Sequence, residues 1–457
     1  DCPQNLREEE MFEVPEWAAN KVVYQIFPSR FAATEPVDKE LWYKAPITPM
    51  DDLHGNLRGI IEHMDDIQNL GIDVLYMTPI FQSNSCHKYD TTDYYQIDPS
   101  FGTTEDLKEL VQKAHERGMK VVLDAVYNHT GREFFAFADI LENGEKSKYR
   151  DWYFIDGFPL KSEWGEIPNF KCFGYYGGMP KLNLKNPEVE KYITDVACYW
   201  IKECDIDGWR LDVGDEISHF FWKNFRKAVK AVKKDMLIIG EIWHYAGDFL
   251  EGDEWDTVMN YPFYLNLIDL LADEKITVSQ FVQNLGYLKG RLHKNCYPLM
   301  WNLIDSHDTA RFLHLCNDNK KKQHLAAAFQ LLLPGMPMIY YGDEYAMPGA
   351  NDPDCRRGMY WDEEYQDKEM YEWYKRLIQV RKSHACIVEG ELAGSVTEDE
   401  EGTVVLIRKN GEETIAMIFN CSSSAKKFNE YTQKYNLLTE NTFDGNVEGF
   451  DAAVIVL

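Results

Sequence analysis

Short apolar runs alternate with segments of helical periodicity along the first 385 residues of this chain. Val22–Pro28 is an apolar run that proline ends, which is typical of a buried strand. Residues 56–70 then carry apolar side chains at helical spacing and stop at Gly71, a frequent residue at helix C-termini. The next strand covers 74–80. Such nearly continuous apolar runs indicate parallel strands that helices cover on both faces.

The alternation of strand and helix continues beyond these first elements. The predicted strands are 22–28, 74–80, 121–126, 207–212, 237–242, 258–261, 299–305 and 338–341. The predicted helices include 56–70, 103–118, 187–202, 220–233, 277–292, 322–333 and 366–382. We count eight strand–helix units, which are enough to close a barrel. The expected fold class is therefore α/β, with a (β/α)₈ TIM barrel.

Two segments depart from the barrel pattern. Residues 131–186 are rich in Gly, Pro, Lys and aromatic residues and show no long helical pattern, which indicates an inserted B domain after the third strand. From residue 386 the period changes to two, and Asn410-Gly411 separates two alternating runs as in a β-hairpin. We expect a C-terminal antiparallel β-sandwich there. The predicted division is barrel 1–129 and 187–385, B domain 130–186, and C-terminal β-domain 386–457.

Composition and charge narrow the functions that this chain can have. Lys and Arg number 48 against 76 Asp and Glu, a formal net charge of −28 at pH 7. Phosphate binding needs clustered cations, so this balance argues against a nucleic-acid partner and against an anionic membrane surface. Aromatic residues make up 14% of the chain, and their faces can line a groove for sugar rings. A neutral substrate is therefore favoured.

Sequence signals of location are sparse. No apolar run reaches the roughly 18 residues of a membrane span, and no signal peptide is recognisable. The 10 cysteines are dispersed without paired CxxC motifs, which favours reduced thiols over a zinc site. These features favour a cytoplasmic location and no membrane partner. A chain that begins at Asp1 leaves a processed N-terminus and secretion open.

Charged residues follow the predicted strands at the end where a barrel carries its functional residues. Arg210 and Asp212 are two residues apart on one strand, so both side chains lie on the same side of it. A guanidinium so close favours the ionised carboxylate and lowers its pKa. Taken alone, the pair could equally be an ion pair that joins neighbouring strands. The third, fifth and seventh strand ends favour a functional interpretation, because they carry His129, Glu241, His307 and Asp308.

Different surroundings separate the roles of these carboxyl groups. Glu241 lies among apolar residues, where desolvation would raise its pKa and keep it protonated. An ionised carboxylate that faces a protonated one, about 5–5.5 Å away, is the arrangement that cleaves a glycosidic bond with retention. Asp212 is then the nucleophile and Glu241 the acid. Asp308 would bind sugar hydroxyls and stabilise positive charge, while His129 and His307 would donate hydrogen bonds to hydroxyl groups.

Six blocks of sequence resemble the alpha-amylase superfamily. Those similar to its four signature regions are Asp124–His129, Gly208–Asp212, the Gly-Glu-Ile-Trp-His stretch around Glu241, and Asn302–Asp308, and the two further blocks are Val23–Phe31 and Gly335–Glu344. The resemblance covers most of the chain in the family's order. It implies the barrel, the inserted B domain and the C-terminal β-domain, and it implies a retaining alpha-glucan hydrolase.

Within this superfamily the chain resembles the neopullulanase, cyclomaltodextrinase and maltogenic amylase group. Met179–Asn183 is similar to the marker of that group, and His87–Thr91 and Trp243-His244 point the same way. The resemblance implies cleavage of alpha-1,4-glucosidic bonds in maltooligosaccharides, cyclodextrins, pullulan or starch. It also implies transglycosylation when an acceptor sugar replaces water.

The resemblance further implies residues that bind substrate. Tyr89 would stack on the sugar at the cleavage point. Asp352 and Arg356 would hold the neighbouring glucose on the non-reducing side, and Trp243 would lie on the leaving-group side. Core packing is the alternative for each aromatic residue.

Two departures from the group leave properties open. Relatives usually carry an additional N-terminal β-domain that helps to form a dimer, whereas about twenty residues precede the first strand here. The oligomeric state and any preference for cyclic substrates therefore stay open. Many superfamily members bind calcium between barrel and insertion, through the Asn of the first signature region and a His after the nucleophile. Asn128 is present, but residues 213–216 read Val-Gly-Asp-Glu, so we predict no calcium at that position. The oxygen-rich loops leave a different calcium site open, although the sequence reveals none, and no other cofactor is expected.

Two other functions compete with this prediction. An alpha-1,6- or alpha-glucosidase specificity, or a predominant transferase, would use the same carboxylates, and the products from pullulan would tell them apart. A non-catalytic sugar-binding homologue would lack one or more of the carboxylates, whereas this chain has all three.

Overall fold

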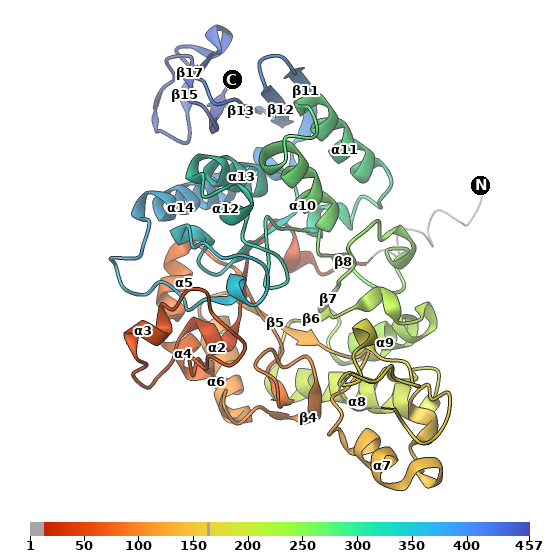
Figure 1. Ribbon diagram of the computed structural model, residues 1–457. Helices are drawn as coiled ribbons and strands as arrows, with labels where there is room; N and C mark the ends of the chain where they lie inside the picture. The colour runs from red at the N-terminus through yellow and green to blue at the C-terminus, as the bar shows by residue number, and fades with distance from the viewer. Residues whose placement is uncertain (1–12, 162–164) are drawn as a thin grey trace, which may run out of the picture.

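Eight parallel strands form the centre of the computed structural model, which describes residues 13–161 and 165–457. The strands pair in the order β8-β7-β6-β5-β2-β1-β10-β9. A parallel bridge between Met259 and Trp301 joins the two ends, so the sheet closes into a barrel (Figure 1). The strands are β1 (Val23–Ile26), β2 (Val74–Met77), β5 (Lys120–Ala125), β6 (Gly208–Leu211), β7 (Leu237–Gly240), β8 (Thr257–Val258), β9 (Trp301–Asn302) and β10 (Met336–Tyr340). The predicted barrel is confirmed.

Alternating side chains divide strands such as β1, β2 and β7 between two apolar clusters. Val23, Tyr76 and Ile239 pack together inside the barrel, whereas neighbouring residues such as Tyr24 and Ile238 pack outward against the helices. Every residue of β1, β2, β6 and β7 is buried, which explains the continuous apolar runs. Trp17 and Ala18 join the interior cluster and close the N-terminal end of the barrel.

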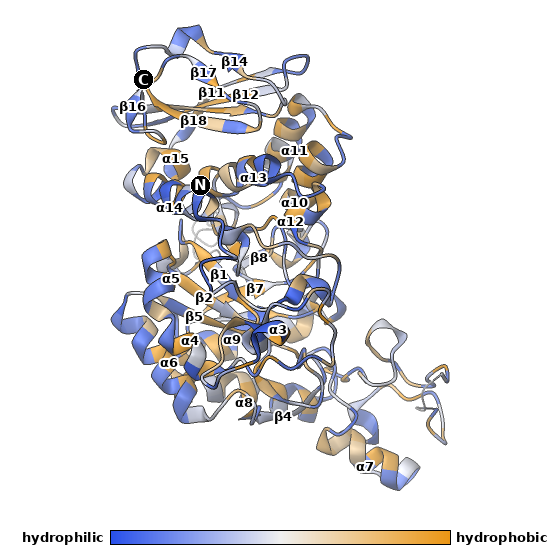
Figure 2. Cartoon of the chain, turned by 60° about the vertical axis from the view of Figure 1, so that its left-hand side comes forward, coloured by the Kyte–Doolittle hydropathy of each residue, from blue (hydrophilic) through white to orange (hydrophobic). Residues whose placement is uncertain are grey.

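Helices surround the barrel, and Figure 2 shows that they carry mixed polar and apolar faces around more apolar strands. The barrel helices are α2 (Pro28–Phe31), α3 (Lys39–Trp42), α4 (Leu57–Glu62), α5 (Met64–Leu70), α6 (Thr104–Glu116), α8 (Pro187–Cys204), α9 (His219–Val232), α10 (Tyr261–Leu267), α11 (Val278–Gly290), α12 (Phe312–Leu315), α13 (Lys320–Leu332) and α14 (Lys368–Ser383). The single helix predicted over 56–70 is wrong in one detail. It breaks at His63, whose ring stacks on Trp361 with centroids 3.6 Å apart.

Two segments leave the barrel before strand β6. A hairpin of β3 (Phe81–Ser83) and β4 (Thr91–Ile97) follows β2, and the sequence pattern did not predict it. The described part of the insertion after β5 contains one α-helix of nine residues, α7 (Phe135–Asn143), and projects from the side of the barrel (Figures 1 and 2). Isolated bridges such as Tyr153 to Leu182 hold the rest of it together. The domain limits at 130, 186 and 386 stay predictions.

The C-terminal part begins with α15 (Cys386–Glu389) and forms an antiparallel sheet above the barrel (Figure 2). Its order is β11-β12-β13-β18-β15-β16, and a β14-β17 ribbon accompanies it. The strands are β11 (Glu391–Glu398), β12 (Thr403–Asn410), β13 (Glu413–Asn420), β14 (Lys426–Lys427), β15 (Tyr435–Asn436), β16 (Asn441–Thr442), β17 (Asn446–Val447) and β18 (Asp451–Val456). Asn410 pairs with Glu413, so the hairpin predicted at Asn410-Gly411 is confirmed. Val404 faces the barrel helices, and Val405 faces a separate cluster under the ribbon.

The structure also bears on cysteines and membranes. Among the described residues, nine cysteines are free thiols and five of them are buried; Cys2 lies outside those residues. In the same part of the chain, no helix is both long enough and apolar enough to cross a bilayer.

Candidate active site

Arg210 stands at the centre of the strand ends and touches carboxyl groups from three adjacent strands. Its Nη1 lies 3.0 Å from Asp212 Oδ1 and 3.1 Å from both oxygens of Asp124. Its Nη2 lies 2.9 Å from Glu241 Oε2. The register β5-β6-β7 places Asp124 beside Arg210, and all four side chains are buried. The predicted bond between Arg210 and Asp212 is confirmed. The guanidinium also pairs with Asp124 and Glu241, which the sequence did not indicate.

Sharing the guanidinium changes the expected charge balance. Three carboxyl groups surround one cation, so full ionisation would leave two uncompensated negative charges in a buried site. Burial raises the pKa of Asp212 well above its usual range, and the carboxylates of Glu241 and Asp124 add to that, while Arg210 acts in the opposite direction. The lowered pKa predicted for Asp212 is therefore wrong. Burial likewise raises the pKa of Asp124 to about 6.

Glu241 lies in a more polar setting than its apolar sequence neighbours predicted. Its Oε2 accepts a hydrogen bond from the Val213 amide at 2.9 Å and pairs with Arg210. Its Oε1 accepts from Trp243 Nε1 at 3.2 Å. Trp243 is 42% exposed and stacks on Tyr261 with centroids 4.0 Å apart. The expectation of a purely apolar environment around Glu241 is wrong, because a strand-end amide and a neighbouring guanidinium both reach Oε2.

A chain of hydrogen bonds fixes His307 and Tyr89. The amide of Gln25 lies 2.7 Å from His307 Nδ1, and Tyr89 Oη lies 2.5 Å from His307 Nε2 and 3.0 Å from Asp124 Oδ2. Gln25 Nε2 can only donate, so His307 Nδ1 accepts and its proton sits on Nε2. Tyr89 then accepts from His307 and donates to Asp124. Burial holds the pKa of His307 well below its usual range, which keeps the ring neutral.

His129 is buried and binds the backbone at Tyr89. Its Nε2 donates to the Tyr89 carbonyl oxygen at 3.0 Å, and its ring stacks on Phe173 with centroids 5.1 Å apart. Burial lowers the pKa of His129 to about 4. The predicted donation to a sugar hydroxyl stays untested, because in this structure the Nε2 proton of His129 is used by Tyr89.

Asp308, Arg356 and Asp352 form a connected group at the open side of the cluster. Arg356 Nη2 lies 3.3 Å from Asp308 Oδ1, and its Nη1 lies 2.7 Å from Asp352 Oδ1. Its Nε donates to the His307 carbonyl oxygen at 2.7 Å. The side chains of Asp308 and Asp352 are 31% and 48% exposed. The structure therefore brings together all ten residues that the sequence predicted for the site.

Sequence reasoning gave no role to three residues of this network. Asp124 bonds Arg210 and Tyr89, Tyr76 donates to Asp124 at 2.7 Å, and Gln25 fixes the tautomer of His307. Each of them interrupts an otherwise apolar strand. A polar residue inside a buried apolar run needs a partner, because an unpaired buried polar group is costly. That is the signal that could have found them.

Calcium does not fit the position that the superfamily resemblance implies. Asn128 Oδ1 is 2.5 Å from Lys181 Nζ, which also lies 2.8 Å from Glu216 Oε2. Calcium needs six to eight oxygen ligands at about 2.3–2.6 Å, and an ammonium group already takes these oxygens. Among the described residues, no group of three or more His, Cys, Asp and Glu could hold a metal ion.

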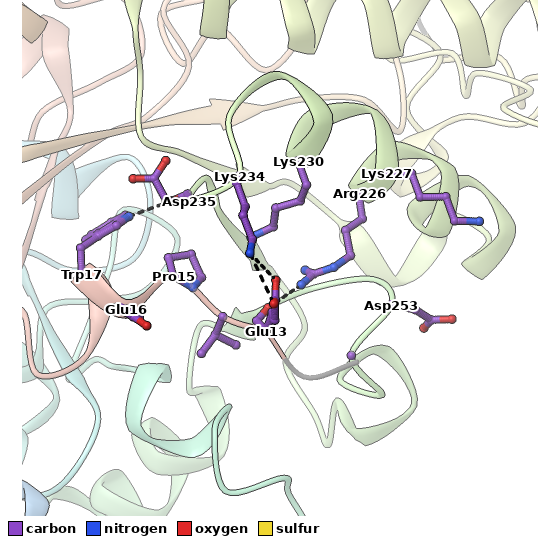
Figure 3. Close-up of a pocket in the computed structure, with 12 residues that line it drawn as sticks. Glu13, Pro15, Glu16, Trp17, Arg226, Lys227, Lys230, Lys234, Asp235 and Asp253 are labelled. Carbon is purple, nitrogen blue, oxygen red and sulfur yellow. Dashed lines mark hydrogen bonds and ion pairs between the residues drawn. The ribbon is translucent and has the colours of Figure 1, made fainter. Parts of the chain in front are cut away.

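A cavity of about 840 Å³ lies elsewhere, between residues 13–17 and α9 (Figure 3). Figure 3 shows Arg226 and Lys234 directed toward Glu13. Arg226 and Lys230 also pair with Asp256 at 2.7 and 2.9 Å. Because α9 ends just before β7 begins, this cavity lies at the N-terminal end of the barrel. It contains none of the predicted site residues.

Paired carboxyl groups at the carboxyl ends of neighbouring barrel strands are the arrangement that a TIM-barrel glycosidase needs. The sequence profile described as "Alpha amylase, catalytic domain" matches residues 25–390. The chain belongs to the alpha-amylase family of glycosidases.

Individual relatives agree with this assignment. A cyclomaltodextrinase from Geobacillus thermopakistaniensis (strain MAS1) is 46% identical over 428 residues, which is 93% of this chain and 72% of that protein. A solved cyclomaltodextrinase structure superposes with a TM-score of 0.92 at 38% identity, covering 97% of this chain and 79% of the other. The cyclic alpha-maltosyl-(1→6)-maltose hydrolase from Arthrobacter globiformis gives a TM-score of 0.89 at 35% identity, covering 97% of this chain and 100% of the other.

Proposed function

We propose that this glycosidase cleaves alpha-1,4-glucosidic bonds with retention, with Asp212 as nucleophile and Glu241 as acid and base. One observation carries the proposal. Arg210 holds one oxygen of Asp212 and one oxygen of Glu241, which orients two carboxyl groups from adjacent strands toward a common space. Asp212 Oδ2 is buried and has no hydrogen-bond partner among residues 13–161 and 165–457, so it is the oxygen available for attack.

The first step forms a glycosyl-enzyme. The step starts from ionised Asp212 and protonated Glu241, and Asp212 Oδ2 attacks the anomeric carbon while the bond from that carbon to the leaving oxygen breaks. Oε2 of Glu241 accepts from Val213 and pairs with Arg210, so the transferable proton sits on Oε1. That proton passes to the leaving oxygen. Trp243 Nε1 donates to Oε1, which supports the proposal that Trp243 lies on the leaving-group side.

The second step releases the sugar. The ionised Glu241 takes a proton from water, and the water oxygen bonds to the anomeric carbon as the ester bond to Asp212 breaks. Two inversions give net retention, and an acceptor hydroxyl in place of water gives transglycosylation. Asp308 would bind hydroxyls of the distorted ring and stabilise its positive charge. Tyr89 would stack on that ring, and Asp352 with Arg356 would hold the next glucose.

The relatives' names support an alpha-glucan substrate. The similarity to a cyclomaltodextrinase that is 46% identical supports the hypothesis that this chain acts on cyclodextrins and maltooligosaccharides with alpha-1,4 bonds. The name of the Arthrobacter relative, a cyclic alpha-maltosyl-(1→6)-maltose hydrolase, places an alpha-1,6 bond in the substrate of that protein. Alpha-1,6 cleavage is therefore the second candidate function. The cytoplasmic location stays a prediction, and the oligomeric state stays open.

Two assays test the proposal. Digestion of pullulan should give panose if alpha-1,4 bonds are cut and maltotriose if alpha-1,6 bonds are cut. Proton NMR of the first product of maltotriose cleavage should show the alpha anomer. A beta anomer would contradict retention, and a separation of Asp212 and Glu241 carboxyls near the roughly 6.5–9.5 Å of inverting enzymes would contradict it as well.

A further inference from the structure

Lys181 lies on the insertion, yet its ammonium group binds two strand-end loops of the barrel. Nζ is 2.5 Å from Asn128 Oδ1, 2.8 Å from Glu216 Oε2 and 3.0 Å from the Glu216 carbonyl oxygen. The three acceptors match the three N–H donors of an ammonium group. The side chain is 18% exposed. Asn128 also donates to Glu216 Oε2 at 3.1 Å, which closes a small network at the junction of barrel and insertion.

Glu216 is the last residue of a tight turn that follows the nucleophile candidate. The 3₁₀ turn η5 (Gly214–Glu216) starts after Val213, which has a left-handed φ of 47°. That conformation is unfavourable for a β-branched side chain and persists only where neighbouring contacts hold it. Glu216 N bonds the Val213 carbonyl oxygen at 3.1 Å, so fixing Glu216 helps to fix Val213.

Val213 in turn holds Glu241. Its amide donates to Glu241 Oε2 at 2.9 Å. The turn packs tightly beneath it, because a Cβ on Gly214 would lie 2.8 Å from the Trp255 ring. A continuous series of contacts therefore runs from Lys181 through Glu216 and Val213 to the carboxyl group of Glu241.

We propose that Lys181 is a positioning residue, an internal cation that holds turn 213–216 so that the strained Val213 amide orients Glu241 for proton transfer. The ammonium group occupies the junction in place of a divalent cation, so the activity does not depend on one. This inference rests on the proposed role of Glu241. Lys181 does not act on substrate itself, because its three N–H donors are already used.

The test compares Lys181→Met with Lys181→Arg and with Lys171→Met, which removes an exposed lysine of the same insertion. Two substrates separate the roles: maltotriose, whose leaving sugar needs a proton, and an aryl maltoside with an acidic phenol, which needs little. Lys181→Met should lower kcat on maltotriose about 10²-fold, as misplacement of a catalytic group does. It should lower kcat on the aryl maltoside far less. Lys181→Arg should restore most of the loss, and Lys171→Met should match the wild type.

A second measurement does not depend on turnover. Treatment of the wild-type protein with EDTA should leave its Tm unchanged, and added Ca²⁺ should not raise it. Equal losses on both substrates, an unchanged kcat in Lys181→Met, or a fall of Tm with EDTA would each overturn the inference. Failure of the proposed function is distinguishable, because the wild type itself would then not cleave maltotriose.

Discussion

The two ends of strand β6 each carry a buried aspartate, and the two are paired in opposite ways. Asp207, at the N-terminal end, accepts from His115 Nε2 at 2.7 Å, Lys120 Nζ at 2.9 Å and Lys233 Nζ at 3.0 Å. Asp212, at the C-terminal end, shares one guanidinium with two other carboxyl groups. Asp207 therefore has several donors to itself, whereas Asp212 shares a single cationic side chain with two other carboxyl groups.

The difference shows in the direction of the pKa shifts. Burial opposes the charge on Asp207, but its hydrogen bonds and cations hold its pKa well below the usual range. For Asp212 burial and the neighbouring carboxylates hold the pKa above it. In a barrel, residues at the N-terminal end of the strands serve stability and those at the C-terminal end serve chemistry. An incompletely paired carboxylate at the C-terminal end thus marks the functional end of this strand.

The largest effect is expected from Asp212→Asn. Loss of the nucleophile should lower kcat on maltotriose on the order of 10⁴-fold or more. The Tm should stay level or rise, because the change removes a charge from an underpaired cluster. Assay and thermal denaturation of the same sample check both halves. Near-normal turnover, or a large fall of Tm, would contradict the assignment of Asp212 to chemistry rather than to stability.

Glu241→Gln should have the next largest effect. Loss of a general acid costs about 10²–10⁴-fold, and the loss should be smaller for an aryl maltoside whose leaving group needs no proton. The amide can still accept from Val213, so the strand end should keep its shape. A loss of the same size on both substrates would argue that Glu241 is structural.

Asp207→Asn should affect stability and leave turnover unchanged, the opposite of Asp212→Asn. It should lower the free energy of unfolding by about 3 kcal/mol at neutral pH, since it leaves partly buried cations unpaired, and it should leave kcat unchanged. The depressed pKa of Asp207 means that its contribution is present above the ordinary value of 3.8 and is lost as the pH falls through the folded value. Urea denaturation should therefore show wild type and variant converging in acid. A loss of kcat with full stability in Asp207→Asn would contradict the assignment of Asp207 to stability and of Asp212 to chemistry.

Asp124→Asn should have the smallest effect, on the pH profile. Asp124 is one of the carboxylates that raise the pKa of Asp212, and its own pKa is raised to about 6. Without that negative charge Asp212 ionises at lower pH, so the acid limb of kcat/KM should move to lower pH. Asp207→Asn is the control, and its limb should not move. A limb that stays in place or moves upward in Asp124→Asn would show that the cluster is not electrostatically coupled.

Part of this site follows from local sequence, and part depends on neighbouring strands. Arg210 and Asp212 are two residues apart, so strand alternation alone predicts their contact. The contact from Arg210 to Glu241 depends on how β6 and β7 align, which a single sequence does not give. For that reason the contact between Arg210 and Asp212 was predicted correctly, whereas the apolar environment predicted for Glu241 was wrong. The left-handed Val213 gives no sequence signal either, since a valine there is unfavourable.

The fold was more predictable than the boundaries of its elements. Eight apolar runs predicted eight barrel strands, because every strand is buried on both faces. The strand predicted over 299–305 is confined to Trp301–Asn302, since the following residues leave the sheet to carry Asp308. The β3-β4 hairpin that positions Tyr89 was not predicted, because its strands are only partly buried.

Covalent trapping tests the central claim most directly. A 5-fluoroglucosyl fluoride should label the wild-type protein by forming a slowly hydrolysed ester with the nucleophile. Peptide mapping by mass spectrometry should then place one sugar on Asp212 within the Gly208–Asp212 stretch, with no label in Asp212→Asn. A label on Glu241 or Asp308, or turnover of the fluoride to the inverted product without any covalent species, would contradict the account.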